Sequence, residues 1–250
     1  MAAIDASIYE KFSIESTDGS KNVDISKGVI TFAYYEDIFS PTITAKAIIT
    51  NDGSTIEGPE GKLTSLYNGL PIRGGERVML KIAGNSEGNP GMDFSEDPTK
   101  YLYVSSVKNV IQNTNSETFV LDLVPRETIT NETSRVGKKF SSSTSISDSV
   151  KDIVKNYLKT DRLSEDNVDK TQNPYGFLGN LKKPFTVLTW LASKSVPGDI
   201  SGKDATAGYL FYETIDGYNF KSIDSLIAQD PVKGTYVYTE VAITDMPDND

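Results

Sequence analysis

The sequence predicts an α+β fold in which a strand-rich first half precedes a mixed region with two amphipathic helices. Three observations carry this prediction. Apolar residues recur at every second position through much of residues 1–126, they recur at helical spacing over 146–158, and a second helical pattern follows Pro184. The 250 residues, of which 37% are hydrophobic and 24% charged, have the size and composition of a globular protein with one or two domains. We expect a domain boundary near residues 126–140.

Period-two alternation identifies the strands of the first half. Within residues 77–82, the apolar side chains face one side of the strand, while Arg77 and Lys81 face the other. The same alternation or a run of β-branched and aromatic residues predicts further strands over 29–35, 43–50, 101–111 and 118–123. Turn signals such as Asp18-Gly19 separate these runs. Five or six such strands favour an antiparallel sheet that curls into a barrel or a sandwich.

Residues 84–98 interrupt the strand pattern. The segment contains three Gly, two Pro and four acidic residues, and it has no basic residue. Because so polar and broken a segment packs poorly, we expect a long exposed excursion between two strands.

The helical region begins with a capping signal at Ser145, where Asp148 takes the place of the usual Glu of a capping box. One helical face then carries the apolar residues Ile146, Val150, Ile153, Val154, Tyr157 and Leu158. A second helix is expected to begin at Pro184 and to end before Pro197-Gly198. We expect its Trp190 to be buried against the sheet, so that removing the ring costs about 3–5 kcal/mol.

The last part of the sequence predicts a hairpin, a short helix and a final strand. The hairpin pairs residues 208–214 with 218–222 around Asp216-Gly217, the helix covers 222–228, and the strand covers 235–244. Most of the 13 Tyr fall on predicted strands, where they belong either to the core or to a subunit interface.

Two absences exclude most familiar enzyme designs. The chain has no Cys and no His, which removes thiol nucleophiles, disulfides, thiolate metal sites and the commonest acid–base relay. The net charge of −10 argues against a nucleic-acid reader. Residues 1–137 carry 12 basic and 19 acidic side chains, whereas residues 138–183 carry 9 basic and 6 acidic ones, which is a mildly basic stretch typical of a docking surface or a solvated helix face.

The remaining candidates for chemistry are weak. The paired acids Glu36-Asp37, Glu96-Asp97 and Glu165-Asp166 lie in no recognisable apolar cleft. Lys138-Lys139 beside the hydroxyl-rich run 141–149 is better explained by a helix cap than by a Ser–Lys nucleophile. We therefore predict no catalytic, cofactor-binding or metal-ligating residue, no cofactor and no enzymatic activity. A cell-wall glycosidase with two carboxylates is the enzymatic alternative.

Several segments together resemble the central baseplate hub protein of contractile-tailed bacteriophages (myoviruses), especially those that infect marine cyanobacteria. The resemblance covers about residues 8–240. It is carried by the following segments: KFSIESTDGSKNVDISK (11–27), YYEDIFSP (34–41), GLPIRGGERV (69–78), RETITNETSRVGKKF (126–140), residues 147–158, KPFTVLTWLASKS (183–195) and YLFYETIDGYNFKSIDSL (209–226).

The resemblance implies a structural virion protein. Such a hub is a homotrimer in which each subunit contributes two tube-like β domains, so that six domains match the sixfold tail tube above and a threefold spike binds below. Residues 1–126 would then be one tube-like β-barrel domain, 127–232 a helical or mixed insertion domain, and 233–250 the opening strand of a truncated second tube-like domain.

The resemblance also implies partners and a location. The partners are the tail tube or a tube-initiator protein, the central spike protein, and baseplate wedge or tape-measure proteins. Genomic DNA would pass through the ring without specific binding. Because residues 1–137 carry a net charge of −7, we expect the channel wall to be acidic or neutral, with few Lys or Arg. The location is the virion tail baseplate, after assembly in the host cytoplasm. The alternative is another tube component of a phage tail or secretion system. With one tube-like domain, the chain alone is expected to be monomeric or loosely associated.

Overall fold

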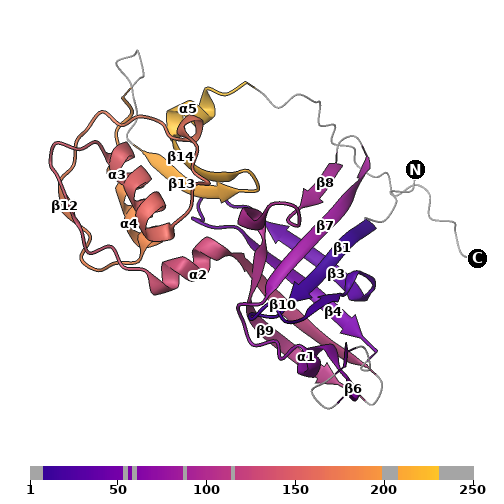
Figure 1. Cartoon of the computed structure of the whole chain (residues 1–250). Coiled ribbons are helices and arrows are strands. Elements are labelled where there is room, and N and C mark those ends of the chain that lie inside the picture. The colour runs from indigo at the N-terminus through magenta and orange to yellow at the C-terminus, as the bar shows by residue number, and fades with distance from the viewer. Residues whose placement is uncertain are drawn as a thin grey trace, which may run out of the picture.

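A computed structural model describes residues 8–52, 56–57, 61–86, 89–113, 116–198 and 208–230. Figure 1 shows a sheet formed by the first half of the chain and, beside it, a part that contains most of the helices. The α+β prediction is confirmed. The predicted strand 235–244 and the whole segment 233–250 lie outside the described residues.

The first half forms an eight-stranded antiparallel sheet in the order β2-β1-β7-β9-β10-β4-β3, with β8 paired to β7. Its strands are β1 (Ile8–Glu15), β2 (Asn22–Asp24), β3 (Val29–Tyr35), β4 (Thr44–Asn51), β7 (Arg77–Ser86), β8 (Asn89–Asp93), β9 (Leu102–Gln112) and β10 (Glu117–Pro125). All five strands predicted from alternation or composition are present.

The core of the sheet follows from this alternation. On β10, Phe119, Leu121 and Leu123 are fully buried, and their neighbours across the ladder are Ile49, Ala47 and Ala45 of β4. Because successive side chains of a strand point to opposite faces, every second residue of both strands enters the same core.

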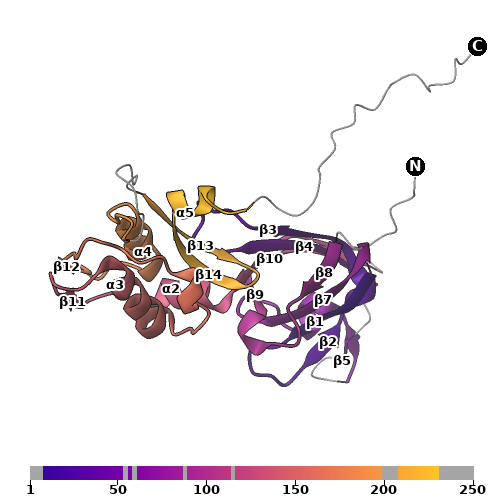
Figure 2. The same cartoon turned by 90° about the horizontal axis from the view of Figure 1, so that it is seen from above.

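The sheet curls strongly but does not close into the barrel that the resemblance implied. Its two end strands, β2 and β3, are consecutive in the chain and are joined through the 3-10 turn η1 (Ser26–Gly28), yet no ladder joins them among the described residues. The curl brings Phe12 of β1 and Phe32 of β3 into edge contact, with ring centroids 6.3 Å apart. Figure 2 shows the resulting two layers of strands. The free side of β3 is therefore a sheet edge.

The prediction of an exposed excursion over 84–98 is wrong. Strand β7 continues to Ser86, and the chain returns as β8 with Lys81 opposite Asp93. Phe94 follows β8, is 1% exposed, and donates its backbone N–H to Leu80 O. One apolar anchor and a continued backbone ladder outweigh the polar composition of the segment.

The helical elements of the second part begin where the sequence predicts. Ser145 accepts a hydrogen bond from Asp148 N and caps α3 (Ile146–Ile153), which continues into the π-helical turn η3 (Val154–Leu158). Helix α4 (Pro184–Ala192) has Pro184 in its first turn. A further helix of this part, α2 (Arg126–Thr133), directly follows β10.

The predicted hairpin and the short helix after it are also confirmed. Strands β13 (Tyr209–Thr214) and β14 (Gly217–Ser222) pair around the turn at 215–216, and Ser222 caps α5 (Ile223–Ile227). In both Figure 1 and Figure 2 this hairpin lies between helices α3 and α4 and the sheet. The remaining short elements are β5 (Ile56–Glu57), β6 (Leu63–Thr64), α1 (Leu66–Gly69), η2 (Pro98–Lys100), β11 (Lys139–Phe140), η4 (Glu165–Asn167) and β12 (Phe177–Leu178).

Two clusters of buried apolar residues result. One lies within the curled sheet and extends from Phe12 to Leu123, and the other extends from Val136 to Phe220. No helix in the described part of the chain is long and apolar enough to cross a membrane.

The prediction that Trp190 is buried against the sheet is wrong. Leu188 and Leu191 of α4 enter the core, whereas Trp190 is 39% exposed. Its ring lies edge-on to Tyr175 and Phe177, with centroid distances of 5.6 and 5.5 Å. Because a helix turns about 100° per residue, Trp190, which lies between the core residues Leu188 and Leu191 in the sequence, points to the flank of the helix.

Candidate functional site

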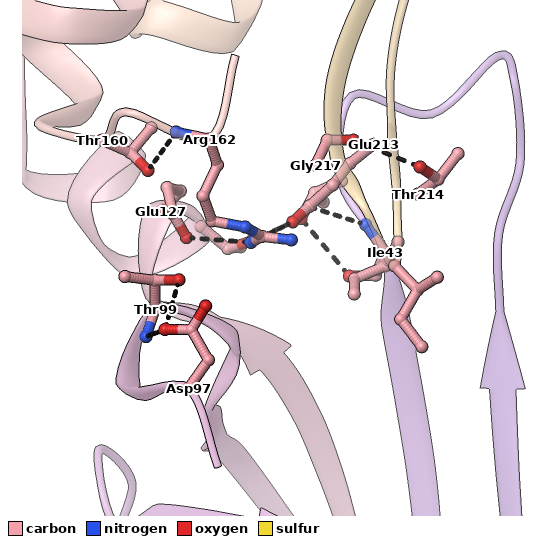
Figure 3. A network of polar contacts seen from close by, with 12 residues as sticks. Ile43, Asp97, Thr99, Glu127, Thr160, Arg162, Glu213, Thr214 and Gly217 are labelled. Atoms are coloured by element: carbon pink, nitrogen blue, oxygen red, sulfur yellow. Dashed lines mark hydrogen bonds and ion pairs between the residues drawn. The ribbon is translucent and has the colours of Figure 1, made fainter. Parts of the chain in front are cut away.

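A buried polar network lies between the two hydrophobic clusters. It joins Arg162, in the irregular segment after η3, to Glu213 on β13 and to Glu127 in the first turn of α2. Figure 3 shows these three side chains converging from different elements, with Ile43 of the sheet on the opposite side of Glu213. We call Arg162, Glu213 and Glu127, together with Thr42 and Thr128, the seam network.

The ion pairs of the network are almost completely shielded from water. Arg162 Nη1 lies 2.7 Å from Glu213 Oε1 and 3.7 Å from Glu127 Oε2. The side chains of Arg162, Glu127 and Glu213 are 9%, 5% and 0% exposed. Buried charges persist in proteins only when they are paired and hydrogen-bonded.

Glu213 also connects the hairpin to the sheet. Its Oε2 accepts hydrogen bonds from the backbone N–H of Ile43 at 3.1 Å and from Thr42 Oγ1 at 3.0 Å. The Thr42 hydroxyl lies 2.7 Å from Thr128 Oγ1, which extends the network to α2. The Glu213 carboxylate therefore binds both Arg162 of the second part and the residues that directly precede β4 in the sheet.

Gly217 allows the hairpin to approach the segment that contains Arg162. A Cβ at this position would lie 2.3 Å from Arg162 O, and the residue has a φ of +132°. The approach lets Tyr218 N donate to Arg162 O at 2.8 Å. The guanidinium carbon of Arg162 lies 5.8 Å from the centre of the Tyr218 ring, within the range of a cation–π contact.

The electrostatics of the network centre on two carboxylates that share one cation. Burial raises the pKa of Glu213 to about 7, against the opposing effect of Arg162. Burial alone would lower the pKa of Arg162, but Glu213 and Glu127 hold that pKa above its ordinary value. Glu127 Oε2, Arg162 Nε and the Tyr218 hydroxyl are buried without a hydrogen-bond partner among the described residues.

A second contact joins the tip of the hairpin to the end of β3. Glu36 Oε1 accepts hydrogen bonds from the Tyr34 hydroxyl and from Ile215 N, both at 2.6 Å. Burial and the bond to Glu36 raise the pKa of Tyr34. The contact places a member of the predicted Glu36-Asp37 pair at the border between the two parts.

The other polar groups singled out from the sequence have separate structural roles. Glu96 pairs with Lys81, and Glu165 pairs with Lys151. Lys138 pairs with Asp152, and the Ser145 hydroxyl is used by α3. No group of three or more acidic side chains is arranged to hold a metal in the part of the chain that the structure describes.

Sequence reasoning missed the seam network. Arg162 lies in an irregular segment that gives no signal, and Glu127 is hidden at the start of a polar helix. Glu213 was detectable in principle, because it falls on the same alternating face of its strand as the buried Tyr209 and Phe211. A charged residue on an apolar face requires a buried partner.

No family model and no curated protein matches the chain. Among solved structures it is similar to the 43 kDa tail protein of prophage MuSo2 from Shewanella oneidensis, with a TM-score of 0.48 and 12% identity over 86% of this chain and 52% of that one. It is also similar to a tail protein from Neisseria meningitidis MC58, with a TM-score of 0.46 and 11% identity over 84% of this chain and 49% of that one. The chain thus spans about half the length of each.

Proposed function

We propose that the chain is a structural component of a contractile phage tail, and more specifically a subunit of the baseplate hub. In this role, three subunits form a ring that joins the sixfold tail tube to the threefold spike and surrounds the DNA exit channel. The chain acts through contacts and carries out no reaction.

The observation that carries the proposal is where the family-like segments meet. Glu36, Glu127 and Glu213 belong to three separate segments that resemble the hub family, and all three lie at the border between the sheet and the second part. A resemblance confined to one element would reflect local structure alone. Here it covers the residues that hold two parts of the chain together, which is what an adaptor between two assemblies requires.

The physical character of the border also supports an adaptor. Relative motion between two packed parts is the default when their border is small and polar. In this chain the border contains an almost fully buried ion network and two carboxylates that accept backbone N–H groups, Ile43 N and Ile215 N. We infer that these bonds hold the two parts in one relative orientation, as an adaptor requires.

The edge strand β3 supports assembly into a ring. It pairs only with β4 among the described strands and leaves Ile30 and Tyr35 more than half exposed. An unprotected edge with apolar side chains is a template for pairing with another chain. We propose that the tail tube or its initiator protein and the neighbouring subunits bind on this side, and that the spike and wedge or tape-measure proteins bind elsewhere on the ring.

The test is reconstitution with the tail-tube and spike proteins of the phage that encodes this chain. We expect the purified proteins to form a complex with three copies of this chain between tube and spike, as seen by cryo-electron microscopy and native mass. Six copies would instead identify a tube component. Failure to bind either protein would overturn the proposal, and loss of turbidity of a cell-wall suspension would favour the glycosidase alternative.

A further inference from the structure

An apolar groove lies on the second part, on both sides of β12. One side encloses about 340 Å³ and the other about 520 Å³, and both are lined by Phe177 and Leu178 of β12. Trp190 and Val187 of α4 complete the first side, and Phe140 contributes to the second. We call this surface the β12 groove. Leu178 is 54% exposed and Trp190 is 39% exposed, so the groove presents an aliphatic and an aromatic side chain to solvent.

The turn after β12 exposes a further apolar residue at a cost in backbone strain. Asn180 and Leu181 have φ angles of 50° and 54°, both in the left-handed region, and Leu181 is 68% exposed. A bulky residue in this region is an outlier that persists only when the surrounding structure demands it. Backbone hydrogen bonds hold this turn, from Leu181 N to Val136 O and from Lys182 N to Gly179 O, both at 3.0 Å, and they leave the Leu181 side chain on the surface.

The charge around the groove has one sign. Lys182 lines the first side and Lys139 the second, and no acidic residue lines either. Both lysines are exposed, and no carboxylate in the described part of the chain pairs with them. The complementary partner therefore combines a large apolar side chain with neighbouring carboxylates.

The chain itself carries such a segment in the connection between β3 and β4. Phe39 is 77% exposed and Ile38 is 47% exposed, and both directly follow the exposed acids Glu36 and Asp37. No cation in the described part of the chain pairs with either acid. The segment is ordered by its own hydrogen bonds, because Asp37 accepts from Phe39 N at 2.8 Å through its side chain and from Ser40 N at 2.9 Å through its carbonyl. A preformed segment loses little conformational entropy on binding.

The segment cannot enter the groove of its own chain. Figures 1 and 2 both place β12 at the end of the second part farthest from the sheet, whereas the β3–β4 connection adjoins the tip of the hairpin β13–β14. The occupant must belong to another molecule.

We propose that the β12 groove binds residues 36–39 of a second copy of this chain. Phe39 enters between Trp190 and Leu178, and Glu36 and Asp37 face Lys182 and Lys139. Because the two surfaces differ, the contact is heterologous and links copies head to tail, so it forms a closed ring when the rotation between copies permits and an open chain otherwise. A contact this small is weak by itself, in line with the expectation that the chain alone is monomeric or loosely associated. The inference deepens the proposed function, since it names the contact between subunits of the ring.

The experiment uses two variants that each remove one half of the contact. Phe39→Asp removes the inserted side chain, and Leu178→Asp places a charge in the groove. We expect sedimentation velocity of the unaltered chain to show mass that rises with concentration and falls at high salt, and each variant to remain monomeric at the same concentrations. An equal mixture of the two variants retains one complete contact, so we expect it to form dimers and nothing larger.

Ile111→Asp is the matched control, because Ile111 of β9 is 59% exposed and lies on neither surface. We expect this variant to associate like the unaltered chain, and thermal unfolding to be unchanged in all three variants. Association that survives both Phe39→Asp and Leu178→Asp, or a mixture that stays monomeric, would overturn the inference. So would an unaltered chain that is monomeric at every concentration. None of these results affects binding to tube and spike, which tests the hub role separately.

Discussion

The two parts of the molecule reach stable packing by different means. In the sheet, long strands such as β9 and β10 pair over most of their length, and the core between the layers is mainly aliphatic. In the second part the described strands have at most six residues, and isolated bridges such as Val136–Lys182 join irregular segments. Its core depends on aromatic rings, including the stacked pair Phe211 and Tyr218 at 5.5 Å.

This difference shows which interactions determine the geometry of each part. Backbone ladders fix the geometry of the sheet, so alternation of apolar residues suffices to define it. The second part has few ladders, and its geometry depends on side chains that bind backbone groups, such as Asp169 accepting from Ser222 N at 2.8 Å. Single substitutions of polar residues should therefore matter more in the second part and at the seam network than in the sheet.

Substituting one buried aromatic residue in each core tests whether the two parts unfold together. Phe119 of the sheet and Phe220 of the hairpin are both fully buried, so Phe119→Ala and Phe220→Ala should each lower the free energy of unfolding by about 3–5 kcal/mol. Because the seam network joins the parts, we expect both substitutions to shift the transitions followed by circular dichroism and by fluorescence of Trp190, the only Trp, to the same extent.

Phe39→Ala is the control and should have almost no effect on an isolated molecule, because Phe39 is 77% exposed. If Phe119→Ala left the Trp190 transition unchanged, the sheet and the second part would be independent folding units.

Breaking the seam network should have the next largest effect. Arg162→Met leaves Glu213 and Glu127 buried without their cation, and we expect a loss of about 3 kcal/mol at pH 8, measured by urea unfolding. Arg135→Met is the control, because Arg135 is exposed and its hydrogen bonds within the described residues go to the backbone carbonyls of Glu132 and Ser134. Equal losses for the two variants would contradict the importance of the network.

The pH dependence of the free energy of unfolding tests the role of Glu213 in the seam network. The pKa of Glu213 is raised in the folded protein to about 7 from an ordinary value of 4.5, so between these pH values the folded chain holds a proton that the unfolded chain has released. The contribution of Glu213 to the free energy of unfolding should therefore fall as pH rises from about 4.5 to about 7 and stay level above. At about 1.4 kcal/mol per pKa unit its size is up to about 3 kcal/mol.

Glu213→Gln removes this titration, so the difference between the two pH profiles isolates it. We expect the variant to show a flatter profile between pH 4.5 and 7 in urea titrations. A profile parallel to that of the unaltered chain would show that Glu213 keeps one protonation state throughout this window.

The smallest predicted effects compare helix caps in the two parts. Ser145 caps the longer helix α3 and also donates to Asp148, whereas Ser65 caps only the single-turn α1 beside the sheet. We expect Ser145→Ala to cost about 1 kcal/mol and Ser65→Ala about 0.5 kcal/mol in thermal unfolding. The reverse order would mean that α1 contributes more to the sheet than its length suggests.

The parts of the fold that were predictable are those set by local patterns. Alternation located β4, β7 and β10, and the Ser145 cap and Pro184 located the starts of α3 and α4. In each case the pattern arises within one element and needs no knowledge of its neighbours.

The failures come from tertiary context. Polar composition predicted an exposed excursion where Phe94 anchors a hairpin, and hydrophobicity predicted a buried Trp190 where the helix turns it outward. The seam network joins residues up to 171 positions apart, as in the bond from Thr42 to Glu213, so no short window of sequence contains it. The β12 groove was likewise visible only as a mildly basic stretch.

The π-helical turn η3 has a consequence for how the length of the chain can vary between relatives. A π turn holds one residue more than an α turn, because its hydrogen bonds span five residues and not four. Losing one residue between Val154 and Leu158 would convert η3 into a continuation of α3 and leave the chain on either side in place. The same deletion in the segment 159–162 would draw Arg162 away from Glu213. Natural insertions and deletions of single residues should therefore be found in the turn and be absent from the four positions after it.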